Sequence, residues 1–266
     1  MKSISISSVS LAFAGLLVGN TVFAFEVTTE FSADAVQRAP DRAEYRARMY
    51  VSKNAVRTDS VINKIAVTEI MKSRKQVRLL LVAKDKIYFQ QKSTQVEKIN
   101  SDKPAAKKPC TGLKDTTCEM LGKEKINNRQ TEKWQFVVKR NGQTYRSLHW
   151  IDVKRKMPVR EFFPDGTVTE LSINGKEKMN GRETEKWLLQ TTRPDGQQLS
   201  SKQWYDPELG LTIREEVPGG FIRELQNIKT GRQDKKLFAI PAGYKKVEQL
   251  PAYLSPPQPA VRPGSP

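Results

Sequence analysis

The chain has 266 residues, of which 37% are hydrophobic and 28% charged, and its formal net charge is +17. One histidine and two cysteines are too few to indicate a zinc centre. No stretch after the first 24 residues is long and apolar enough for a transmembrane helix.

The first 24 residues have the pattern of a secretory signal peptide. Lys2 supplies the positive start, residues 9–18 are apolar, and Val22-Phe-Ala24 forms a cleavage site before Phe25. A retained membrane anchor is the alternative, but the segment is too short and wrongly flanked for a span. We expect export by the Sec route, cleavage after Ala24 and a periplasmic location.

The basic charge predicts attraction to polyanions and anionic membrane surfaces. In an exported protein these are lipid head groups, lipopolysaccharide or acidic polysaccharide, and we expect no nucleic acid. The basic residues are scattered along the chain, which is also typical of an ordinary solvated surface.

Short runs of β-branched and aromatic residues follow the signal segment, separated by turn residues. They cover residues 25–37, 44–51, 54–59, 77–83 and 86–91. Such spacing predicts an antiparallel, mainly β protein. The one weak helical rhythm lies in residues 60–74, through Ile62, Ile65 and Ile70, so we expect little helix.

Residues 101–109 read as a loop or linker, which is either a domain boundary or a long insertion in one sheet. We treat residues 25–250 as a single domain. Cys110 and Cys118 follow, and in an oxidising compartment they predict a disulfide, which stabilises the fold by about 2.5 kcal/mol on chain-entropy grounds. A metal site is the alternative, but His149 is distant in sequence, and we expect no metal or cofactor.

The sequence then repeats itself with a period of about 53 residues. Residues 122–134 return as residues 175–187, with ten of thirteen positions identical. The likeness continues, so that the two copies cover residues 122–171 and 175–225. The four tryptophans occupy equivalent places in the copies: Trp134 and Trp150 in the first, Trp187 and Trp204 in the second. A repeat of this length indicates the architecture, because each copy forms one supersecondary unit that packs against the next.

Each copy is predicted to be a strand meander with defined turns. Asn127-Asn128 and Asn180-Gly181 mark the first turn, Asn141-Gly142 and Asp195-Gly196 the second, and Pro164-Asp-Gly166 and Pro218-Gly-Gly220 the third. Trp134, Phe136 and Val138 share one strand face, as do Trp187 and Leu189. We therefore expect the two copies and the N-terminal hairpins to form one large curved antiparallel sheet.

Several motifs resemble the periplasmic lipoprotein carriers LolA and LolB and an uncharacterised periplasmic family near them. They are Trp150-Ile-Asp152 followed by Pro158-Val-Arg160, the closing Leu237-Phe-Ala-Ile-Pro-Ala-Gly-Tyr244, and the order of Phe31-Ser-Ala-Asp, Arg48-Met-Tyr-Val-Ser-Lys and Cys110…Cys118. The likeness spans most of the mature chain. It implies an incomplete β-barrel, a half-barrel whose concave side holds an acyl chain, and a link to outer membrane lipoprotein sorting. The carriers close the barrel with helices, whereas this chain offers at most one weak helical segment, which favours a shallower groove.

The candidate ligand-binding residues are aromatic and aliphatic side chains of the repeats: Trp134, Phe136, Trp150, Phe162, Trp187, Leu189 and Trp204. On a concave face they would form an apolar floor, with basic residues at the rim. The same side chains also suit a sheet core.

An enzyme is the alternative from another class. His149 is the single histidine and shows no partnered nucleophile motif, while Asp152 and Asp206 suit turn caps better than an acid and base pair. We expect no catalytic residues. Residues 251–266 form a proline-rich tail without the composition to pack.

We therefore predict a non-enzymatic periplasmic carrier or sensor of a lipid, lipoprotein acyl chain or other amphiphile, with a lipid or acylated protein as partner. The alternative is a basic interaction module that holds an anionic envelope polymer or a partner protein.

Overall fold

The structure is a computed structural model that describes residues 29–73, 75, 77–92, 108–111 and 113–254. The described part is built from strands and two short 3₁₀ helices, without an α-helix. The predicted signal peptide, most of the predicted linker and residues 255–266 of the tail lie outside the described residues. No helix in the described part has the length and apolar character needed to cross a membrane.

The strands of the N-terminal third are β1 (Phe31–Ala39), β2 (Arg42–Ser52), β3 (Ala55–Ile62), β4 (Ile65–Lys72), β5 (Val77–Val82) and β6 (Ile87–Lys92). The first copy of the repeat supplies β7 (Thr116–Ile126), β8 (Arg129–Arg140), β9 (Gln143–Asp152) and β10 (Pro158–Phe162). The second copy and the end of the chain supply β11 (Val168–Met179), β12 (Arg182–Thr192), β13 (Gln198–Asp206), β14 (Leu211–Val217), β15 (Phe221–Thr230), η2 (Lys235–Phe238), β16 (Lys245–Val247) and η3 (Ala252–Leu254).

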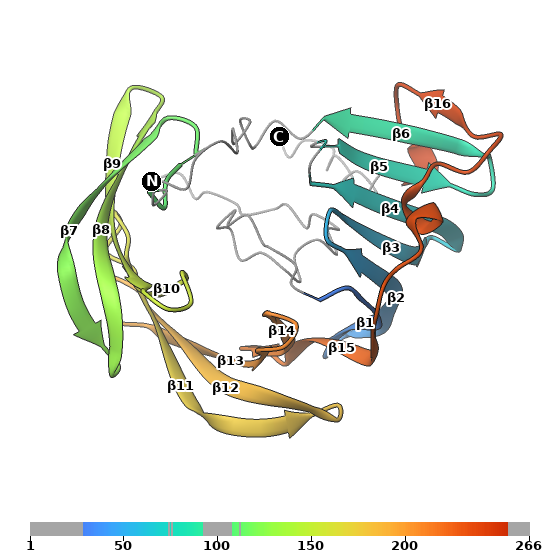
Figure 1. Cartoon of the computed structure of the whole chain (residues 1–266). Coiled ribbons are helices and arrows are strands. Elements are labelled where there is room, and N and C mark those ends of the chain that lie inside the picture. Colours follow the sequence, from blue (N-terminus) through green and yellow to red (C-terminus); the bar gives the residue numbers. More distant parts are fainter. Residues whose placement is uncertain (1–28, 74, 76, 93–107, 112, 255–266) are drawn as a thin grey trace, which may run out of the picture.

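All sixteen strands belong to one sheet, in the order β16-β6-β5-β4-β3-β2-β1-β15-β14-β13-β12-β11-β10-β9-β8-β7. Every pairing is antiparallel except that of β16 with β6. The sheet curls into an unclosed ring, with β7–β9 on one side and β2–β6 on the other (Figure 1). The predicted mainly β, large curved antiparallel sheet is therefore confirmed.

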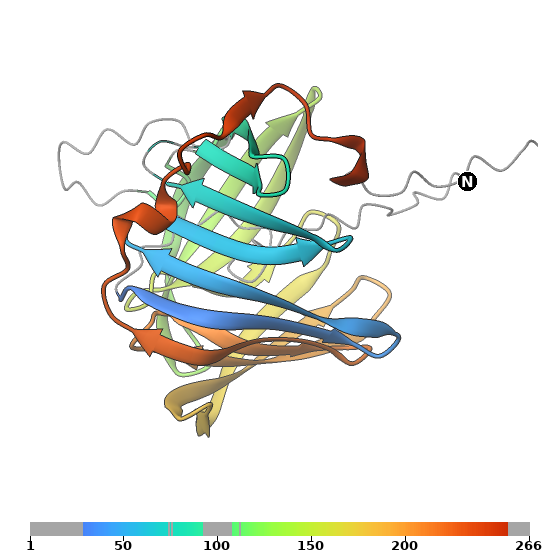
Figure 2. The ribbon, with the colours of Figure 1, turned by 90° about the vertical axis from the view of Figure 1, so that its right-hand side faces the viewer.

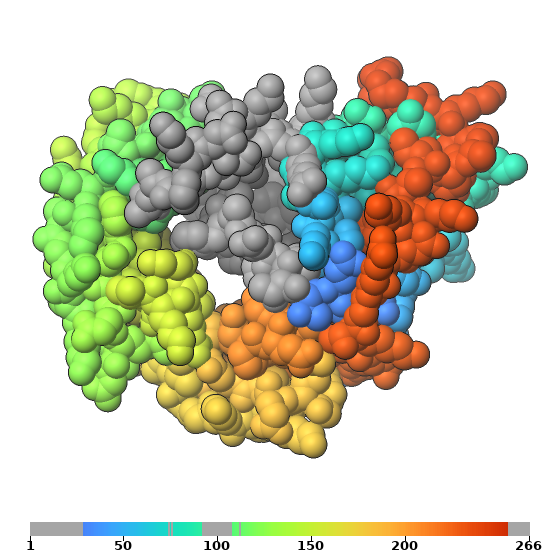
Figure 3. All heavy atoms as spheres, in the orientation of Figure 1, coloured from blue at the N-terminus to red at the C-terminus, as the bar shows by residue number. Residues whose placement is uncertain are grey.

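Figure 3 shows the same view with all side chains. The green arm of β7–β9 and the blue and teal arm of β1–β6 stand apart, joined through the gold and orange strands of the second copy. The sheet order gives the reason, because β1 pairs with β15 and so joins the N-terminal hairpins to the end of the repeats.

The first predicted turn of each copy has the backbone geometry that two-residue hairpins need. Asn127 and Asn128 have φ values of 48° and 61°, and Asn180 and Gly181 have 49° and 78°. Positive φ at both central positions matches the right-handed twist of the flanking strands, and asparagine and glycine tolerate it best. These turns set the register of β7 with β8 and of β11 with β12.

The helical rhythm of residues 60–74 does not produce a helix. Asn63 and Lys64 form a turn with φ values of 50° and 64°, and Ile62 lies opposite Ile65 across it. Two adjacent left-handed residues interrupt a helix, and the β-branched residues around them favour strands. The segment is therefore the hairpin of β3 and β4.

The apolar core follows the sheet in separate clusters. The largest packs Phe31, Met49 and Val51 with Leu211 and Leu225, and thus spans the junction of β1 with β15. A second cluster, in the repeats, contains Trp150 and Trp187. A third places Phe238 of η2 on Ile70 and Leu79.

Candidate ligand-binding site

The strand register divides the candidate residues between the two faces of the sheet. Residues directly opposite each other on neighbouring strands share a face, and successive residues alternate. Trp134 lies opposite His149, whereas Trp150 lies opposite Lys133 and Arg160. Trp187 lies opposite Gln203, whereas Trp204 lies opposite Lys186.

The C-terminal segment identifies the outer face. Its helix η2 packs on Ile70 and Leu79, and Figures 1 and 2 show it outside β2–β4. Directly opposite residues on neighbouring strands connect Ile70 on β4, through β1 and β15, to Trp204 on β13. The same pairings continue from β13 to Trp150 on β9, so by register all three side chains are on one face. By register, the inner, concave face therefore carries Trp134, Phe136, Trp187 and Leu189, and the outer face carries Trp150, Phe162 and Trp204. Trp150 nevertheless packs in one buried cluster with Leu171 and Trp187, where the turns at Asn127 and Arg155 reach β11 and β12. The seven predicted residues do not share one surface.

The two outer tryptophans sit in matching clamps of charged side chains. The Trp204 ring lies between Lys186 Nζ, 5.5 Å from its centroid, and Arg214 Cζ, at 5.4 Å, and its Nε1 donates to Glu177. Trp150 lies between Lys133 and Arg160, at 4.9 and 5.2 Å, and its Nε1 donates to Glu124.

Both clamps leave the indole buried and its N–H satisfied. Corresponding residues of the two copies thus make the same contacts. Cation–π contacts and hydrogen bonds within the chain engage both Trp150 and Trp204. Phe162 is exposed on this face.

On the inner face, Trp187 stacks on Tyr205 with ring centroids 4.3 Å apart and planes 14° apart. The Arg155 guanidinium lies over both rings, and it pairs through both terminal nitrogens with Glu185. Glu185 also accepts from Trp187 Nε1 at 3.0 Å. Burial works to raise the pKa of Glu185, but the hydrogen bonds from Arg155 and Trp187 outweigh it and leave that pKa lowered.

A chain of polar side chains crosses the inner face beside Phe136. Ser147 Oγ lies 2.7 Å from His149 Nε2, and His149 Nδ1 lies 2.9 Å from Glu161 Oε1. Thr169 donates to the other oxygen of Glu161, and the Phe136 ring lies 4.3 Å from the imidazole. A hydroxyl, an imidazole and a carboxylate in this order resemble an acid–base relay.

Sequence reasoning missed this relay. Glu161 and Thr169 reach His149 only across the pairings of β9 with β10 and of β10 with β11. The one available signal was the spacing Ser147-x-His149, which places both side chains on the same strand face. The relay ties three strands together, and we assign it that role.

The predicted disulfide between Cys110 and Cys118 is present. It packs with Phe136 and Trp134, and so fixes the start of β7 against the inner face of β8. Among the described residues, no group of three or more histidine, cysteine or acidic side chains is arranged to hold a metal ion.

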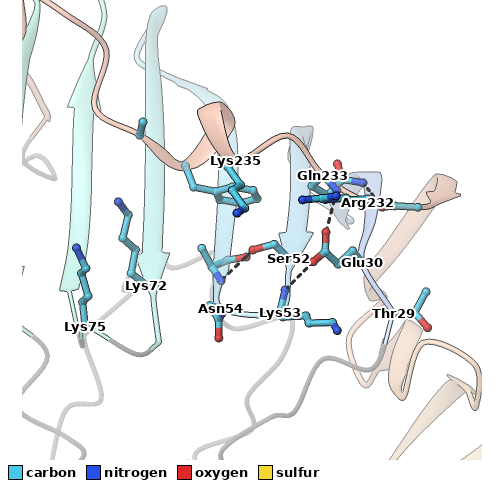
Figure 4. Close-up of a pocket in the computed structure, with 14 residues that line it drawn as sticks. Thr29, Glu30, Ser52, Lys53, Asn54, Lys72, Lys75, Arg232, Gln233 and Lys235 are labelled. Carbon is cyan, nitrogen blue, oxygen red and sulfur yellow. Dashed lines mark hydrogen bonds between the residues drawn. The ribbon is translucent and has the colours of Figure 1, made fainter.

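A separate hollow, not predicted from the sequence, lies under the C-terminal segment. It has a volume of about 880 Å³, and its described lining comes from four parts of the chain: residues 29–30, residues 52–55, Lys72 with Lys75, and six residues between Gly231 and Ala239 (Figure 4). Five of the described lining residues are lysine or arginine. Local hairpins bring the first three parts together, whereas the C-terminal part joins them through the pairing of β1 with β15, which no local sequence pattern indicated.

Comparison with known protein families gives no match, and no curated protein sequence matches either. The chain does resemble solved structures at low identity. One is a LolA superfamily protein from Nitrosomonas europaea, with 13% identity over 80% of this chain and 90% of that one, and a TM-score of 0.35.

A putative outer membrane lipoprotein-sorting protein domain from Vibrio parahaemolyticus has 10% identity over 79% of this chain and 89% of that one, with a TM-score of 0.33. The MucA/MucB complex from Pseudomonas aeruginosa has 12% identity over 80% of this chain and 56% of that one, with a TM-score of 0.31. All three are similarities at low identity.

Proposed function

We propose that this protein is a non-enzymatic periplasmic binding protein that carries or senses a lipid, a lipoprotein acyl chain or another amphiphile on its inner face. One observation carries the proposal. Apolar side chains that are only partly buried run along the concave face in both arms of the sheet, among them Leu189 and Tyr205 in the repeats and Leu80 and Phe89 in β5 and β6. Apolar side chains left partly open on a soluble protein are often part of a binding surface, and these are the candidates for one here.

The proposed mechanism is burial of an apolar tail against this face. Each buried methylene contributes about 0.8 kcal/mol, so a tail of ten or more carbons binds well even in a shallow groove. The net charge of +17 favours encounter with anionic head groups and surfaces. The disulfide supports an oxidising compartment such as the periplasm.

Leu188 and Leu189 provide a matched pair for the test, since they are neighbours on β12 that face opposite sides of the sheet. Both are partly buried. Replacing Leu189 by glutamine places an amide on the inner face, whereas Leu188→Gln makes the same change on the outer face. The probe is a dansylated fatty acid titrated into the mature chain and followed by fluorescence.

We expect wild type and Leu188→Gln to bind the probe and Leu189→Gln to bind about tenfold more weakly, because a buried amide without a partner costs on the order of 1–3 kcal/mol. Equal binding by all three proteins, or no binding by wild type, would overturn the proposal.

The second candidate is adhesion of the basic surface to an anionic envelope polymer, favoured by the net charge of +17. Salt separates the two functions. Tail burial persists at high ionic strength, whereas adhesion through exposed charges is screened. Binding of the fatty acid that vanishes at high salt would favour the second candidate.

A further inference from the structure

The hollow under the C-terminal segment gathers basic side chains from several parts of the chain. Its described lining includes five cations: Lys53, Lys72, Lys75, Arg232 and Lys235. None of these five lies within 4.0 Å of a carboxylate oxygen of a described residue, whereas many other arginines of the sheet are paired, such as Arg48 with Asp34 and Arg182 with Asp206.

One carboxylate, Glu30, is present in the described lining, and backbone groups already use it. It accepts from Gln233 N at 2.8 Å and from Lys53 N at 3.5 Å. Figure 4 shows both contacts as dashed lines. Glu30 therefore has a structural role in the wall of the hollow, and it forms no ion pair with the lysine ammonium groups.

The walls are held by hydrogen bonds between segments. Gly231 N donates to Glu30 O at 2.8 Å, and Arg57 Nη1 donates to Leu237 O at 2.8 Å, which fixes the C-terminal segment on β1 and β3. On the opposite side, Ser73 N donates to Asn54 O at 3.0 Å. Because these segments are already fixed, ordering them on ligand binding costs little conformational entropy.

The hollow is also amphipathic. Phe238, Ala55 and Ala239 contribute apolar atoms to its lining, together with the methylene stems of the lysines. The side chains of Lys72 and Lys75 stand side by side at one end, while Lys235 and Arg232 come from the C-terminal segment (Figure 4). Burial, and then repulsion from Lys75, lowers the pKa of Lys72, which a bound anion would relieve.

We propose that this hollow, the basic groove, binds the phosphate group of an anionic amphiphile, with the adjoining apolar part on Phe238. Several ammonium groups without internal partners suit a multiply charged oxyanion, and the apolar floor suits the atoms next to it. The basic groove lies on the outer side of the sheet, so this inference does not depend on the proposed inner-face function.

The probes are short-chain phosphatidic acid, inorganic phosphate, and short-chain phosphatidylcholine as the zwitterionic comparison. Binding to the mature chain is measured by calorimetry, and its location by the amide NMR shifts of Asn54, Gly231 and Lys235. The test variant is K72Q/K75Q. The matched control is K123Q/K125Q, which removes the same charge from exposed positions on β7, at the far end of the sheet.

We expect phosphatidic acid to shift the three amides and phosphatidylcholine to leave them unmoved. The K72Q/K75Q variant should weaken binding about tenfold or more, since it removes two charge-assisted contacts, and K123Q/K125Q should change it by about twofold at most. Competition by millimolar inorganic phosphate at the same amides would support the phosphate group as the recognised part.

Other outcomes would overturn the proposal. Unchanged affinity of K72Q/K75Q, or an equal loss in K123Q/K125Q, would show general charge attraction. Inorganic phosphate binding as tightly as phosphatidic acid would exclude the amphiphile. The Leu189→Gln variant keeps the two proposals apart: it should bind the fatty acid poorly and still show phosphatidic acid shifts in the basic groove.

Discussion

Asp152 and Asp206, at equivalent strand ends, each cap a turn with one carboxylate oxygen and pair with an arginine through the other. One oxygen of Asp206 accepts from the backbone N–H groups of Glu208 and Leu209, and the other pairs with Arg182. Asp152 accepts in the same way from Lys154 and Arg155 and pairs with Arg129. Both carboxylates are buried, so each ties a turn to the preceding hairpin.

Alanine at either aspartate should therefore be costly. We expect D152A and D206A each to lower the free energy of unfolding by about 3 kcal/mol, because each leaves a partly buried arginine and two backbone donors without their acceptor. Urea unfolding followed by tryptophan fluorescence measures this. D195A, in an exposed turn where the carboxylate accepts from Gln197 N, serves as the control and should cost under about 1 kcal/mol. Similar losses in D195A and D206A would contradict the double role.

Acid should weaken the fold through Asp34. The hydrogen bond from Asn227, followed by that from Arg48, lowers the pKa of Asp34 below its ordinary 3.8. A depressed carboxyl pKa contributes stability above the unfolded value, and this stability is lost as pH falls through the folded value. We expect D34N to be less stable than wild type at neutral pH and to lose less stability on acidification below about pH 4. Urea midpoints measured across this range test it, with D195N as the control; parallel curves for wild type and D34N would contradict it.

Lys72 should also make stability rise with pH, but in a window at high pH. Its pKa is lowered first by burial and then by Lys75. Between the lowered pKa and the ordinary value of 10.5, the unfolded chain binds more protons, so this group makes stability rise with pH in that window. K75Q should raise the pKa of Lys72 toward its ordinary value, although burial keeps it below. NMR titration of isotopically methylated lysines measures the shift, and a pKa of Lys72 that falls or stays fixed in K75Q would refute the assignment.

The Ser147, His149 and Glu161 relay offers a direct test of the non-enzymatic proposal. If the relay only joins strands, a fluorophosphonate should not label Ser147, and S147A should cost about 1 kcal/mol through the lost hydrogen bond. Mass spectrometry after incubation with the reagent reads the labelling. T169A, which removes the second hydrogen bond to Glu161, should have a cost of the same order. Labelling at Ser147 that disappears in S147A would make the protein a candidate hydrolase.

Local signals explain why the fold was largely predictable from the sequence. Asn180-Gly181 specifies a two-residue hairpin on its own, and alternation within β12 already separates Trp187 from Lys186. Register across strands has no such signal. Irregularities between Ile173 and Lys176 and between Trp204 and Tyr205 shift the pairing, so the surface on which a distant tryptophan ends cannot be counted from its position.

The candidate sites were less predictable for the same reason. Arg155 meets Trp187 and Glu185 across β9–β12, and the basic groove combines residues nearly the whole chain apart. Each of these residues, taken alone, resembles an ordinary surface side chain. Only the three-dimensional pairing brings them into one place.

The pairing of β1 with β15 also has a kinetic consequence. Phe31 lies opposite Thr230, whereas every other antiparallel ladder among the described strands joins two strands that are consecutive in the chain. Local hairpins form within microseconds, but closing so long a loop is slow and gains its free energy only once the ladder forms. We therefore expect the local hairpins to form first and the pairing of β1 with β15 to be the rate-limiting step. Packing of the buried Phe31 and Leu225 at this junction would then set the folding rate of the whole sheet.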